Sequence, residues 1–190
     1  MNRRELFDCM NVIDKYGTDK ALAYAREYLR KEEVKEKEVS LAGIMFGHLY
    51  QLELLREEWG VLLDETQDLL YGDMDACREI RKEFASYQKK NASLDVDILL
   101  EQLLVYFLFT YFPVAVYDGE IYAKAQLAVY CVWMIRELWM ARWVKNEKAL
   151  DLEEMIELVY RFSREVEHSD VNLKKIEKIM EKKWFFREGK

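Results

Sequence analysis

The sequence predicts an all-α fold, a multi-helix bundle of about seven to nine helices formed by one domain, residues 1–190. One proline and seven glycines leave few places where a helix would stop, whereas a sandwich or barrel needs many turns. Apolar residues make up 51% of the chain and charged residues 34%, which is typical of a globular protein.

Apolar residues at helical spacing place the elements along the chain. The predicted helices cover residues 2–15, 19–32, 40–70, 74–90, 94–112, 120–146, 151–167 and 170–186. Gly17 separates the first two, Gly60 is the expected weak point of the third, and Ser93 is an expected N-cap. Pro113 ends or kinks the helix before it. The alternative organisation is an N-terminal sub-bundle, 1–92, packed on a core unit, 93–190.

The two most apolar helices are expected to form the core. Residues 102–117 are an uncharged run, which is shorter than the roughly 20 residues of a spanning helix, so we expect a buried helix and no membrane span. At least four of six large side chains in these helices should be buried. They are Leu103, Phe107, Tyr111, Val129, Trp133 and Ile135.

Charge and cysteine content narrow the function classes. A net charge of −7 disfavours nucleic acid as a partner, because phosphate binding needs a positive surface. Cys9, Cys77 and Cys131 are far apart without a CxxC motif, so we expect small buried side chains in a reducing compartment. The N-terminal MNRRELFD has no apolar signal core, and we expect a cytoplasmic protein.

The densest group of functional side chains is SREVEHSDVNL, residues 163–173. A projection of residues 155–168 as one helix places an apolar stripe on one face. It places Arg161, Arg164, Glu165 and His168 on the opposite face. Such a face could orient a polar substrate, or it could form salt bridges with a neighbouring helix. Ser169-Asp170 is a predicted N-cap for the last helix, with Asn172 near its third position.

Metal and nucleotide motifs are weak or missing in the sequence. Glu165-x-x-His168 has the spacing of di-iron carboxylate bundles, but these need two such pairs, and the other histidine, His48, follows Met45 at that spacing. We therefore predict no metal site. No glycine-rich nucleotide loop follows a strand, and a ligand pocket between the aromatic-rich helices remains open as an alternative.

Three segments together resemble the C-terminal helical region of flagellin lysine-N-methylases, which are bacterial transferases. They are YFPVAVYDGE (111–120), IRELWMARW (135–143) and YRFSREVEHSDVNL (160–173), in that order and spacing. The resemblance implies an all-α, methyltransferase-like domain. Its motif residues here are a structural turn, Asp118 and Gly119, the basic residue Arg142, and a candidate polar site. The candidate polar site comprises Arg136, Glu137, Arg164, Glu165, Glu167, His168 and Asn172.

The resemblance also implies cofactors and a partner. Full-length members of the family are expected to use S-adenosylmethionine and to hold an iron–sulfur cluster in a cysteine-rich N-terminal part. The three cysteines here form no such motif, so we expect no cofactor in this chain and no methylation by the chain alone. Activity would return when the chain is joined to a cysteine-rich partner segment.

The leading hypothesis is a helical domain that helps to bind or position flagellin for lysine methylation dependent on S-adenosylmethionine. The alternative is a non-enzymatic helical interaction module or small-ligand-binding module. If the candidate polar site is one site, Arg136 or Glu137 should pair with Arg164, Glu165 or His168, because unpaired buried charge is costly.

Overall fold

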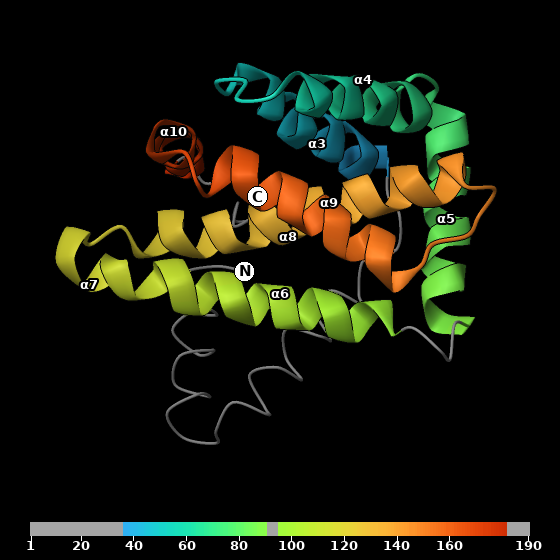
Figure 1. Ribbon diagram of the computed structural model, residues 1–190. Helices are drawn as coiled ribbons and strands as arrows, with labels where there is room; N and C mark the ends of the chain where they lie inside the picture. The colour runs from blue at the N-terminus through green and yellow to red at the C-terminus, as the bar shows by residue number, and fades with distance from the viewer. Residues whose placement is uncertain (1–35, 91–94, 182–190) are drawn as a thin grey trace.

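The chain folds as a bundle of helices, and the computed structural model describes residues 36–90 and 95–181 (Figure 1). The elements are α3 (Glu36–Gly47), η1 (Leu49–Gln51), α4 (Glu57–Tyr71), α5 (Met74–Lys90), α6 (Val96–Tyr111), η2 (Phe112–Val114), α7 (Ala115–Asp118), α8 (Ile121–Lys145), α9 (Leu152–Val166) and α10 (Asp170–Met180). The described ranges contain no strand, which confirms the all-α prediction. The expected hairpin over 2–32 and the expected cap Ser93 lie outside them. The division into 1–92 and 93–190 stays a prediction.

Helix α8 is the centre of the bundle. It runs for 25 residues, and its large side chains Tyr130, Met134 and Trp139 are almost completely buried. Helices α4, α6, α9 and α10 all pack against it. Figure 1 shows α6 alongside α8, α9 crossing it, and α3 and α4 on the opposite side from α6. A helix that is apolar on all sides requires such complete coverage, because every face must leave water.

The core prediction had the right helices but was right for only two of its six positions. Phe107 and Ile135 are buried, whereas the other four residues are only half-buried against the core, so the expectation of at least four buried side chains is wrong. The half-buried residues are Leu103, Tyr111, Val129 and Trp133. Because both segments are apolar on nearly every face, their sequence does not indicate which face turns inward.

Helix α6 buries one face only. Leu100, Leu104 and Phe107 face the core, while Tyr106 is half exposed and Phe109 is 72% exposed. By length and composition alone, Val96–Asp118 could cross a membrane, and it is the single such segment in the described ranges. One segment of this kind is weak evidence for a span, because core helices of soluble proteins meet the same criteria. The sequence-based prediction of a buried helix is therefore wrong for most of this segment, because α6 buries one face only.

The predicted helix 40–70 is wrong in its middle. The chain leaves the helical conformation after η1, and Leu52 (φ −74°, ψ 159°) and Arg56 (φ −140°, ψ 135°) are extended. The break lies at residues 52–56 rather than at Gly60, which is inside α4. Leu52 and Leu55 keep the helical spacing of apolar residues across this break, so periodicity does not reveal it.

Candidate functional site

The segment 163–173 forms the junction between α9 and α10. The Ser169 side chain accepts a hydrogen bond from the Asn172 backbone N–H (3.2 Å), so the predicted N-cap is confirmed. His168 is exposed, whereas Glu165 is 3% exposed and Asn172 is completely buried. The junction is therefore divided between residues that face water and residues that face the protein.

Asn172 binds the extended loop 52–56, which lies more than a hundred positions earlier in the chain. Its side-chain oxygen accepts from the Glu53 N–H (2.7 Å), and its amide donates to the Glu53 carbonyl (2.9 Å) and the Glu165 carbonyl (2.7 Å). Both backbone groups of Glu53 are thus satisfied by one side chain. These partly buried contacts compensate for hydrogen bonds that the loop loses by leaving the helix.

Glu165 supports the same loop. Its Oε2 accepts a hydrogen bond from the Leu55 N–H at 3.0 Å. The helical projection placed Glu165 opposite the apolar stripe of α9, and the structure shows that the loop covers this position. We call Glu165, Asn172 and the backbone of residues 53–55 the loop clamp.

Arg136 and Glu137, the two predicted site residues on α8, have partners on other helices. Arg81 of α5 donates to both oxygens of Glu137 (2.8 and 2.5 Å), and the Tyr71 hydroxyl of α4 donates to Oε2 (2.6 Å). Arg136 donates to Gln88 of α5 (3.2 Å). The ion-pair partner of Glu137 in the described ranges is therefore Arg81, so the expected pairing of Glu137 with Arg164, Glu165 or His168 is wrong.

Burial and the ion pair act in opposite directions on Glu137. Complete burial raises the pKa of this carboxyl, but the charge and hydrogen bonds of Arg81 and the Tyr71 hydroxyl lower it, and the net pKa is below its ordinary value. Burial and the neighbouring carboxylate raise the pKa of Tyr71, so its phenol remains a proton donor. A charged Glu137 inside the bundle ties α4, α5 and α8 together.

The expected turn at Asp118-Gly119 ends α7. Gly119 adopts φ +76°, a left-handed conformation that favours glycine, and its N–H bonds the Ala115 carbonyl. Lys124 of α8 pairs with both Asp118 (3.2 Å) and Glu177 of α10. The predicted structural role of the Asp118-Gly119 turn agrees with the geometry. Through Lys124, the turn is connected to both α8 and α10.

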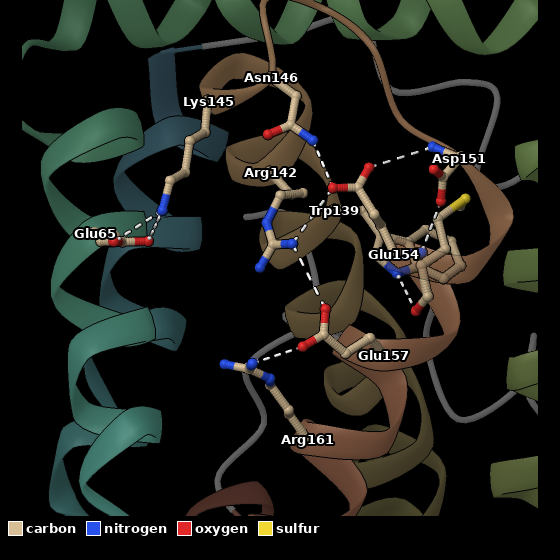
Figure 2. Close-up of polar contacts among 10 residues, drawn as sticks. Glu65, Trp139, Arg142, Lys145, Asn146, Asp151, Glu154, Glu157 and Arg161 are labelled. Carbon is tan, nitrogen blue, oxygen red and sulfur yellow. Dashed lines mark hydrogen bonds and ion pairs between the residues drawn. The ribbon is translucent and has the colours of Figure 1, made fainter.

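The α8–α9 corner is a second polar network (Figure 2). Arg142 reaches Glu154 (3.5 Å) and Glu157 (3.7 Å) of α9, and the Trp139 indole donates to the Met155 carbonyl (3.1 Å). Asp151 caps α9 by accepting from the Glu154 N–H (2.8 Å). These contacts hold the first half of α9 against α8.

Glu167 faces a different environment from the loop clamp. Tyr111 and Tyr106 of α6 both donate their hydroxyls to its Oε1, at 2.6 and 3.2 Å. Burial, followed by the hydrogen bond to Glu167, raises the pKa of Tyr111 well above its usual range, so this phenol keeps its proton. The two phenols therefore fix the position of the Glu167 carboxylate between α6 and α9.

A groove of about 450 Å³ lies beside Glu167, between α6, α8 and α9. Its lining is mostly apolar and aromatic. The lining residues are Leu99, Gln102, Leu103, Tyr106, Phe107, Trp139, Leu152, Met155, Ile156, Val159, Tyr160, Ser163 and Glu167. This volume lies within the range of ligand sites, although the groove is open to solvent along much of its length. Sequence reasoning named Glu167 as a site residue but did not assign Tyr106 and Tyr111 to the site. Their only indication in the sequence is two tyrosines five positions apart on an apolar helix.

The described residues do not supply the ligands of a metal centre. No group of three or more His, Cys, Asp or Glu side chains within 36–90 and 95–181 could hold a metal ion. Cys77 on α5 and Cys131 on α8 are buried, as predicted, while Cys9 lies outside the described ranges. These thiols do not fit the iron–sulfur cluster that the resemblance implies for full-length proteins.

Comparisons with known proteins identify the family. A search of curated proteins and a search of solved structures each return no match. The family model for the FliB lysine N-methylase C-terminal domain matches residues 1–189, nearly the whole chain. This match confirms the resemblance inferred from the three sequence segments. The chain belongs to the family of FliB lysine N-methylase C-terminal domains.

Proposed function

We propose that this chain is a helical substrate-binding domain that positions flagellin for lysine methylation dependent on S-adenosylmethionine. The groove between α6, α8 and α9 carries the proposal, because it combines apolar walls with one fixed carboxylate, Glu167. Family membership supplies the reaction class. The donor would be bound with the help of a cysteine-rich partner segment.

The other polar residues of the predicted site favour a binding role over a catalytic one. Methyl transfer needs an aligned, deprotonated amine and a bound donor. Glu137, Glu165 and Asn172 already serve protein groups as structural partners. His168 is exposed at the α9–α10 junction. Among the named site residues, Glu167 is the one that lines the groove.

The test is flagellin binding with the groove blocked. Ile156 lines the groove and is 59% exposed, while Val171 on α10 is 61% exposed and is not among the lining residues. Ile156→Arg should weaken flagellin binding by about fivefold or more by filling the groove with a charged side chain, whereas the matched Val171→Arg variant should bind like wild type. Isothermal titration calorimetry measures both. Equal affinities for the two variants would contradict the proposal.

A labelling assay separates binding from catalysis. The purified chain, flagellin and labelled S-adenosylmethionine should give no labelled lysine, and label should appear when the cysteine-rich segment is added. Label on flagellin lysines with the chain alone would show that the chain carries the donor site itself. In that case, loss of the label in a His168→Ala variant would show that the exposed histidine takes part in methyl transfer.

A small-ligand-binding module is the second candidate function. The observation that favours it is the groove volume, which lies within the range of small-molecule sites. Flagellin binding that is insensitive to Ile156→Arg, together with a small molecule that stabilises the wild-type chain against heat, would favour this alternative.

A further inference from the structure

The Glu167 carboxylate is fixed at one oxygen and open at the other. Both phenol donors, Tyr106 and Tyr111, bond to Oε1. Across residues 36–90 and 95–181, Oε2 has no hydrogen-bond partner, and no lysine or arginine forms an ion pair with Glu167. A half-buried carboxylate in this arrangement is positioned to accept from a further donor.

The nearest basic residue on the same helix is engaged elsewhere. Arg164 donates from Nη1 to the Tyr160 hydroxyl (3.2 Å), and its guanidinium carbon lies 5.2 Å from the centre of that ring. Arg161 pairs with Glu157 (2.6 Å), one turn earlier on α9. Both cations of this helix end therefore have partners other than Glu167.

The walls of the groove suit an unbranched aliphatic chain. Leu103, Met155 and Val159 offer apolar surface, and Tyr106, whose hydroxyl bonds to Glu167, adds an aromatic ring at the polar end. Aliphatic stems gain free energy from such contacts, and aromatic faces attract ammonium groups. A lysine side chain has both parts, four methylenes followed by an ammonium group.

We infer that the groove binds an alkylammonium side chain, a lysine of the protein substrate, with its ammonium group at Oε2 of Glu167 and its methylenes along α6 and α9. This inference rests on the proposed function and names the part of the substrate that enters the groove. The contact is a charge-assisted hydrogen bond, which is stronger than a neutral one.

Two peptides test the inference with the intact chain. One is a seven-residue peptide with a central lysine among small residues, and the other has norleucine at that position, which keeps the methylenes but lacks the ammonium group. Isothermal titration calorimetry measures the binding of each peptide to the chain. The lysine peptide should bind wild type about five- to tenfold more tightly than the norleucine peptide, as expected for one partly exposed charge-assisted hydrogen bond.

Glu167→Gln is the decisive variant, because an amide oxygen can still accept from Tyr111 while the negative charge is removed. It should abolish the preference for lysine, while the exposed Glu153→Gln control on α9 keeps it. Circular dichroism should show the same melting temperature for both variants. Equal binding of the two peptides by wild type, or an unchanged preference in Glu167→Gln, overturns the inference.

The outcomes separate this inference from the proposed function. Flagellin binding that needs an open groove but does not depend on the charge of Glu167 keeps the proposed function and rejects the lysine contact. Lysine-peptide binding without flagellin binding keeps the contact and rejects the proposed function.

Discussion

The loop clamp and the groove both take polar residues from the segment 163–173 and use them in opposite ways. In the loop clamp, Glu165 and Asn172 are buried and bound to backbone groups of residues 53–55. At the groove, Glu167 is half-buried and has one oxygen without a described partner. Density of functional groups in a sequence therefore does not indicate a reactive site. The partners of each residue decide whether it supports the fold or remains free to bind a ligand.

Breaking the Glu137 ion pair should give the largest loss of stability. Like the loop clamp, this pair serves the fold and not the groove. Glu137→Ala should lower the free energy of unfolding by about 3–5 kcal/mol, because Arg81 would stay buried without its partner. Urea unfolding followed by circular dichroism measures the loss.

A double variant isolates the cause of that loss. Arg81→Met combined with Glu137→Leu replaces the buried pair by apolar side chains and should recover most of the stability. A double variant as unstable as Glu137→Ala would show that packing around α8, rather than the unpaired charge, explains the effect.

Asn172→Ala tests the loop clamp. The free energy of unfolding should fall by about 2–3 kcal/mol, since the Glu53 N–H and carbonyl and the Glu165 carbonyl all lose a buried partner. Amide hydrogen exchange at Glu53 should also become faster. The neighbouring, exposed Val171→Ala is the control and should change little. Unchanged exchange at the Glu53 amide would show that Asn172 does not hold the loop in place.

The free energy of unfolding should depend on pH, because Glu137 has a lowered pKa in the folded chain. The unfolded state then takes up a proton first, so this contribution to stability is present above the ordinary glutamate pKa of about 4.3 and is lost as the pH falls below it. The stability of the Arg81→Met/Glu137→Leu variant should depend less on pH between about 3 and 5. Parallel pH profiles for the two proteins would be evidence against the assigned charge state.

His168→Ala gives the smallest expected effect. The side chain is exposed at the junction, so the free energy of unfolding should change by less than about 0.5 kcal/mol. Flagellin binding should also be unchanged, because His168 is not among the residues that line the groove. Loss of binding in this variant would move the recognition site from the groove to the exposed side of the junction.

Sequence reasoning recovered the features that depend on local chemistry. The all-α class, the Gly119 turn and the Ser169 cap each follow from residues within a few positions of one another. It failed where the deciding contact is distant along the chain. The sequence placed Asn172 only near the third position of the last helix and Glu165 only on the polar face of its helix, because their partners in the loop are 110 to 119 positions away.

The same reason explains the misplaced helix break and the missed groove. Residues 52–56 continue an apolar period, and their non-helical conformation is supported by a distant side chain. Tyr106 and Tyr111 could be assigned a role only after α6 and α9 were brought together around Glu167. Tertiary contacts, rather than local propensity, decided both features.

Hydrogen–deuterium exchange of the intact chain with and without flagellin tests the central claim most directly. The account predicts slower exchange in the segments that line the groove, residues 99–107 and 152–167, and unchanged exchange over loop 52–56. Glu167→Gln should reduce the protection at the groove without affecting the loop. Protection over loop 52–56, with none at the groove, would contradict the account and place substrate recognition on the side of the molecule that we assign to structure.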